Sequence, residues 1–70
     1  MILTEREKNL IIKLDQDGET LKFDDETRSN YQYEVEKPSP KEYRVSKWAI
    51  MCLAVEYFET PEDVIKFIEK

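Results

Sequence analysis

The fold of this chain depends on residues 43–58, which read YRVSKWAIMCLAVEYF. Twelve of these 16 residues are hydrophobic, and from Trp48 onward only Glu56 is charged. The preceding Ser39-Pro40-Lys41-Glu42 has the composition of a helix start, with a serine N-cap, proline at the first helical position and glutamate at the third. We therefore expect a long helix from about Pro40 to Phe58.

A helix that is apolar on all sides must also be covered on all sides. A chain of 70 residues has few other elements that supply such cover. Two arrangements stay open, in which either residues 1–3 fold across the helix or a second protein molecule covers it. We expect the second arrangement, a homodimer, with self-association through Trp48, Met51, Cys52 and Val55.

Toward the N-terminus, residues 9–15 predict a strand in which Leu10, Ile12 and Leu14 lie on one face and Ile11 and Lys13 on the other. Asp17-Gly18 follows, and this pair suits a two-residue hairpin turn. A hairpin closed there joins residues 9–15 to a strand around residues 19–23. Its register gives two apolar cross-strand pairs, Leu14 with Leu21 and Ile12 with Phe23.

The same segment admits a helix over residues 4–15. Thr4 and Glu7 have the spacing of a capping box, and Leu10, Ile11 and Leu14 fit helical spacing. We prefer the hairpin, because its turn and its cross-strand pairs agree with each other. The helix remains the alternative.

The remaining elements are signalled more simply. Residues 24–30 are polar and predict a loop, and residues 31–36 alternate strictly and predict a third strand that Pro38 ends. Thr60-Pro61-Glu62-Asp63 repeats the helix start before an apolar stripe of Val64, Ile65, Phe67 and Ile68. The predicted fold is a single α+β domain over residues 1–70, in the order β-β-β-α-α. In it, a three-stranded antiparallel sheet (the hairpin plus a third strand) packs on the long central helix, and a short C-terminal helix follows.

Composition limits the possible functions. The chain has no histidine, one cysteine and one glycine, and its small size leaves little room for a solvent-excluded cleft. Gly18 follows Asp15 by only three residues, which does not match a calcium-binding loop. We therefore expect no enzyme, no catalytic residue, no metal and no cofactor.

Localisation is predicted from the apolar runs and the cysteine. The longest apolar run is residues 48–55, which is too short to span a bilayer, and no signal peptide is visible. A lone Cys52 within that run fits a reducing compartment. We expect a cytoplasmic protein with no membrane partner.

Charge is distributed unevenly. Residues 1–36 hold ten acidic and five basic residues, whereas residues 37–70 hold six of each, so the net charge of −5 belongs to the first half. One interpretation is an acidic face that docks on a basic protein surface. The other is a set of solvated turns, where aspartate and glycine are simply turn residues. The candidate contact residues are Asp15, Asp17, Glu19, Asp24, Asp25 and Glu26.

A second charged group stands at the start of the predicted long helix. Lys37, Lys41, Arg44 and Lys47 are spaced so that they form a basic stripe there. The stripe suits an anion or the phosphates of a nucleic acid, or it pairs with acids of the same protein. A net charge of −5 is unlike that of most nucleic-acid-binding domains. Tyr31 and Tyr33 suit base stacking or, more simply, the core.

These features favour a small acidic interaction protein without catalytic activity. We expect it to bind, and to inhibit or modulate, a protein partner with a basic surface. As a compositional type it is similar to accessory proteins of phages and mobile elements that block a nucleic-acid enzyme of the host. The alternative is a small homodimeric regulator that contacts nucleic acid through the basic start of the long helix.

Overall fold

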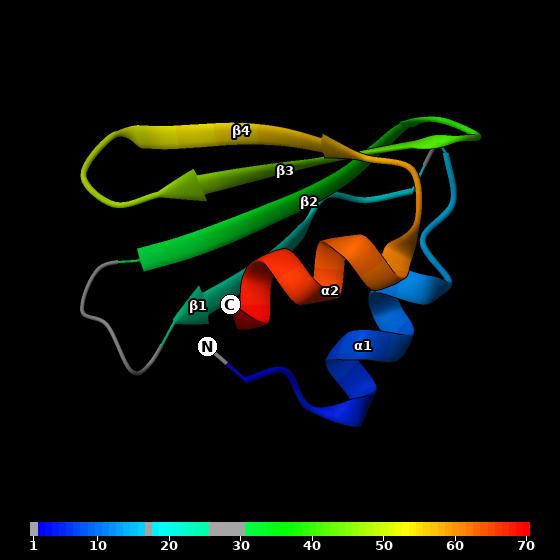
Figure 1. Cartoon of the computed structure of the whole chain (residues 1–70), viewed down its shortest axis with the longest axis horizontal. Helices are drawn as coiled ribbons and strands as arrows, with labels where there is room; N and C mark the ends of the chain where they lie inside the picture. The colour runs from blue at the N-terminus through cyan, green and yellow to red at the C-terminus, as the bar shows by residue number, and fades with distance from the viewer. Residues whose placement is uncertain (1, 17, 26–30) are drawn as a thin grey trace.

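The computed structural model describes residues 2–16, 18–25 and 31–70, and in these residues it contains one antiparallel sheet and two short helices. The elements follow the order α1 (Glu5–Ile12), β1 (Leu21–Asp25), β2 (Tyr31–Ser39), β3 (Glu42–Trp48), β4 (Cys52–Phe58) and α2 (Pro61–Glu69). The four strands lie side by side in sequence order. Both helices lie on the same face of the sheet, as Figure 1 shows.

The predicted long helix over residues 40–58 is wrong, because this segment forms strands β3 and β4. Ser39-Pro40-Lys41-Glu42, which suggested a helix start, is instead the turn between β2 and β3, with Ser39 paired to Glu42. Serine followed by proline is favoured at the start of a β-turn as well as at a helix start. Tyr43 and Val45 are buried between polar neighbours, which is the alternation of a half-buried strand.

The predicted hairpin over residues 9–23 is also wrong, and the alternative of an N-terminal helix is correct. Thr4 and Glu7 form the full capping box: the Thr4 amide donates to Glu7 Oε1 over 2.9 Å, and the Glu7 amide donates to Thr4 Oγ1 over 3.1 Å. Ile11 is fully buried by this helix, whereas Ile12 is 48% exposed. Asp17 of the predicted turn lies outside the described residues.

Strand β1 pairs with β2, whereas the predicted hairpin paired this segment with residues 9–15. Leu21 lies opposite Val35 and Phe23 opposite Tyr33, in place of Leu14 and Ile12. The third strand was predicted at residues 31–36 and ended by Pro38, but β2 continues through Pro38 to Ser39. Together these corrections replace a three-stranded sheet on a long helix with a four-stranded sheet under two short helices.

Helix α2 lies where Thr60 and Pro61 predicted it. The Asp63 amide donates to Thr60 Oγ1 over 3.2 Å, and Val64 and Ile68 are fully buried. The core lies between the helices and the inner face of the sheet, and it consists of Leu3, Ile11, Leu14, Phe23, Tyr33, Val35, Tyr43, Val45, Val64 and Ile68.

The N-terminal segment joins this core instead of covering a long helix. Leu3 is buried, and its amide donates to Glu69 Oε2 of α2 over 3.0 Å. Ile2 is 84% exposed, and Met1 lies outside the described residues. The two ends of the chain therefore meet on the helical side of the sheet (Figure 1).

Candidate functional site

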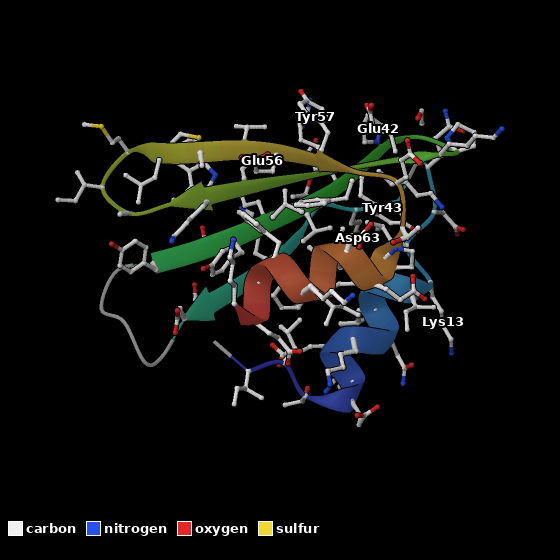
Figure 2. The ribbon with its side chains drawn as sticks, in the orientation of Figure 1. Lys13, Glu42, Tyr43, Glu56, Tyr57 and Asp63 are labelled. Carbon is white, nitrogen blue, oxygen red and sulfur yellow. The ribbon has the colours of Figure 1, made fainter. Side chains whose placement is uncertain are left out.

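The face of the sheet that points away from α1 and α2, called here the outer face, is the candidate site. Cross-strand pairing places three rows of side chains on it, and neither helix covers them. Figure 2 shows Tyr57 and Glu42 on this side, whereas Tyr43 lies between the sheet and α2. The rows are Lys22–Glu34–Ser46–Val55, Asp24–Gln32–Trp48–Cys52 and Glu36–Arg44–Tyr57.

Exposed apolar side chains follow β4 along the outer face and continue into the loop between β3 and β4. Tyr57 is 55% exposed, Leu53 49% and Val55 43%, and in the loop Ile50 is 95% and Met51 67% exposed. Single exposed apolar residues are ordinary, but a contiguous group of them marks a contact surface. We call this group the hairpin patch: Trp48, Ile50, Met51, Leu53, Val55 and Tyr57.

The pairing of β3 with β4 is irregular beside the patch. Lys47 lies opposite Ala54, but Trp48 lies opposite Cys52, so Leu53 is an extra residue in β4. Such a bulge increases the local twist and turns side chains toward one face. The irregularity therefore lies at the end of β4 where the hairpin patch begins.

Trp48 carries a polar atom that the described residues do not satisfy. Its side chain is half-buried, and its Nε1 atom is buried without a hydrogen-bond partner among the described residues. Most buried N–H groups in proteins are paired, so this donor stands out within the patch.

Two pairs of polar side chains on the outer face interact with each other. Arg44 forms an ion pair with Glu36 on the neighbouring strand, and Gln32 Nε2 donates to Asp24 Oδ1 over 2.9 Å. The hydrogen bond to Glu36 raises the pKa of Arg44 above its ordinary value, and the Tyr57 hydroxyl raises it further. These two polar pairs thus have partners within the sheet, while most side chains of the hairpin patch are exposed to solvent.

The described residues of the predicted acidic face lie at the two ends of β1. Asp15 and Glu19 are exposed in the connection that precedes β1, whereas Asp24 and Asp25 end that strand, with Asp25 buried. Residues 20–23 separate Glu19 from Asp24 along the chain. Asp17 and Glu26 lie outside the described residues.

The predicted basic stripe loses its helical spacing. Lys47 lies over the ring of Tyr31, 5.0 Å from its centroid, and Lys37 lies at the same distance over Tyr43. Arg44 is on the outer face, and Lys41 is exposed in the turn between β2 and β3. Lys37 and Lys47 thus make cation–π contacts within the fold, and the four basic side chains are spread over β2, β3 and the turn between them.

Two other predicted site residues are placed by the sheet. Tyr33 is buried in the core, where it meets Phe67 of α2 edge to face at a centroid distance of 6.3 Å. Tyr31 is half-buried beneath Lys47. A base-stacking platform would need both rings exposed on one face.

A metal site and a membrane-spanning helix each place requirements on the described residues. Residues 2–16, 18–25 and 31–70 hold no group of three or more side chains suited to a metal ion. Neither described helix is long and apolar enough to cross a membrane.

The residues predicted for self-association are brought together, although the helix on which they were placed does not exist. Trp48, Met51, Cys52 and Val55 all belong to the β3–β4 hairpin. Sequence reasoning missed Leu53 and Tyr57, whose alternation with Ala54 and Glu56 was the available signal.

No protein-family model, curated protein or solved structure matches the chain, so the function is inferred from the outer face itself.

Proposed function

We propose that this chain is a protein-binding module without catalytic activity, and that the hairpin patch is its contact surface. The single observation behind the proposal is the one-sided arrangement of the sheet. Both helices pack on the inner face, while Leu53, Val55 and Tyr57 remain about half exposed on the outer face.

Burial of this patch against a partner supplies a favourable free energy. Removing apolar surface from water contributes roughly 25 cal/mol per Å². Tryptophan and tyrosine are the side chains most enriched among residues that dominate binding energy, and the patch contains both Trp48 and Tyr57. The paired groups beside them, Glu36 with Arg44 and Asp24 with Gln32, suit the polar rim that surrounds such contacts.

The net charge of −5 favours a partner with a basic surface. In this proposal charge guides the approach of the partner, and the apolar patch provides most of the affinity. A basic partner is therefore expected to associate more slowly as salt is raised, because the attraction between exposed charges is screened.

Site-specific photo-crosslinking in cells tests the proposal. A photoreactive amino acid is introduced at Tyr57 in the patch and, as a matched control, at Lys66, which is exposed on α2. We expect the Tyr57 position, and not the Lys66 position, to give crosslinks to another protein. Such species have a mass that is not a multiple of 8.4 kDa, the mass of this chain. Crosslinking from Lys66 alone, or from neither position, contradicts the proposal.

A further inference from the structure

Strand β4 is an edge of the sheet. It pairs with β3 on one side, and no described strand pairs with its other side. An edge strand presents a row of unpaired backbone N–H and C=O groups, and proteins commonly protect such edges with proline, lysine or several charges. β4 contains no proline, and Glu56 is the one charged residue among its seven.

The opposite edge has a different character. β1 has five residues, of which Lys22, Asp24 and Asp25 carry charged side chains. The edge of β4 is therefore both the longer and the more apolar of the two, and it borders the hairpin patch.

From this edge we infer the identity of one partner, a second copy of this chain. The inference rests on the proposed function, namely that the chain works through protein contact. Strand β4 of one copy pairs antiparallel with β4 of the other about a two-fold axis that passes through Val55. The result is a homodimer in which the two sheets continue into each other and the two hairpin patches adjoin.

The sequence of β4 selects this register. Overlap of the whole strand Cys52–Phe58 with its copy places Val55 opposite Val55 of the second copy, because Val55 is the central residue. Leu53 then lies opposite Tyr57 of the second copy, and the reverse pair forms as well. These apolar and aromatic cross-strand pairs are of the kind that stabilise sheets.

Charge also selects this register. With Val55 on the axis, each Glu56 lies opposite Ala54 of the second copy, so the two carboxylates do not face each other. A register centred on Glu56 would place the like charges directly opposite, which is unfavourable. The bulge at Leu53 lies outside the regularly paired residues Ala54–Phe58, so the central residues Ala54, Val55 and Glu56 keep their symmetry about Val55, and Leu53 and Tyr57 lie at the two ends of the shared segment.

The net charge gives the homodimer a distinctive salt dependence. Two copies with a charge of −5 each repel at long range, and the screening length falls from about 30 Å at 0.01 M salt to about 8 Å at 0.15 M. Because the β4 contact itself is almost uncharged, salt removes the repulsion and leaves the contact intact. Salt therefore strengthens the homodimer, whereas it slows association with a basic partner.

Sedimentation equilibrium of the full chain over a range of concentrations tests the inference. We expect the mass to rise from 8.4 kDa toward twice that value as the protein concentration increases. Added salt should shift this rise to lower protein concentration. A charge placed on β4 should weaken the dimer, so Leu53→Glu and Tyr57→Lys each raise the dissociation constant about tenfold. The double variant restores most of the affinity, because residues 53 and 57 face each other across the axis.

A matched control separates this effect from the change in net charge. Thr20→Glu adds the same negative charge as Leu53→Glu at an exposed position before β1, and it should leave the dissociation constant within about twofold. Far-UV circular dichroism checks that every variant is folded.

A cysteine on the axis provides a test that does not depend on charged substitutions. In a Cys52→Ser background, Val55→Cys brings two thiols together and should give a covalent dimer on mild oxidation. Thr20→Cys in the same background should give no covalent dimer, because residue 20 lies before β1 and away from the axis. A chain that stays monomeric at millimolar concentration and 0.15 M salt overturns the inference, as does a dimer that Leu53→Glu does not weaken.

The two proposals fail in different experiments. A strict monomer refutes the pairing of β4 and leaves the crosslinking result at Tyr57 to decide the proposed function. A dimer whose Tyr57 position crosslinks only to a second copy supports the inference and contradicts binding of another protein through the patch.

Discussion

Replacement of Ile11 or Ile12 by alanine distinguishes the N-terminal helix from the strand that the sequence also suggests. In the structure, Ile11 is fully buried against the core, and its neighbour Ile12 is 48% exposed. In a strand paired through Leu10, Ile12 and Leu14 the order would be reversed, with Ile12 facing the core and Ile11 facing away. The two substitutions remove the same atoms, so each serves as the control for the other.

The expected cost follows from burial. Truncation of a fully buried isoleucine removes three carbon atoms, worth about 2.4 kcal/mol of transfer free energy, and the cavity it leaves raises the cost to about 3 kcal/mol. At Ile12 roughly half of the transfer cost applies and no cavity forms. Alanine also has the higher helix propensity, so Ile12→Ala should cost less than about 1 kcal/mol.

Urea unfolding at low micromolar concentration, followed by far-UV circular dichroism, measures both values. A domain of this size has a total stability of roughly 3.5 to 10 kcal/mol, so Ile11→Ala should remove a large part of it. With a denaturant slope of about 1 kcal/mol per M, the midpoint should fall by about 3 M for Ile11→Ala and by less than 1 M for Ile12→Ala. Equal costs, or a larger cost at Ile12, would refute the assignment of α1.

Three further predictions concern the helix caps, the two faces of the sheet and the thiol. Thr4→Ala and Thr60→Ala each remove an N-cap acceptor and should lower the free energy of unfolding by about 1 kcal/mol, whereas Thr20→Ala should not change it; unchanged urea midpoints for both cap variants would count against the two caps. Val45→Ala should cost about 2 to 3 kcal/mol because Val45 is fully buried, and Val55→Ala less than 1 kcal/mol because Val55 is 43% exposed; similar costs would mean that both faces of the sheet are covered. Cys52 is exposed, so in dilute native protein its thiol should react with a chromogenic disulfide at a rate close to that in urea, and strong protection would place Cys52 inside the fold.

The sequence predicts those elements that have a single strong signal. Thr60 followed by Pro61 begins a helix, and the alternation of Tyr31, Tyr33 and Val35 indicates a strand; both elements are present. The N-terminal segment has two signals that conflict. There the helix forms: Thr4 and Glu7 make the capping box, and α1 buries Ile11. Strand β1 pairs instead with β2.

The prediction of a helix over residues 40–58 is wrong for two physical reasons. Ser39 and Pro40 satisfy the stereochemistry of a helix start and of a β-turn equally well. The second turn, Ala49-Ile50-Met51, has no glycine, proline, asparagine or aspartate to announce it. An apolar run without turn residues looks like a continuous helix, although Tyr43 and Val45 already alternate as in a strand.

The candidate surface could be predicted only in part. The excess of apolar residues in this segment suggested a contact with another molecule, and that prediction still awaits a test. The acidic and basic groups could not be placed, because their grouping on one surface depends on the pairing of strands. Pairing joins residues distant in the sequence, which local patterns do not specify.

Amide hydrogen exchange along β3 and β4, resolved by residue, tests most directly whether β4 is an open sheet edge that pairs with a second copy. In dilute solution we expect slow exchange along β3 and an alternation along β4, where amides directed away from β3 exchange as fast as those of an unfolded peptide. At millimolar concentration in 0.15 M salt these fast amides should become protected, first around Val55. Uniform protection of residues 44–58 at every concentration, as in a continuous helix, would contradict the open edge, and fast exchange that persists at high concentration would contradict the pairing.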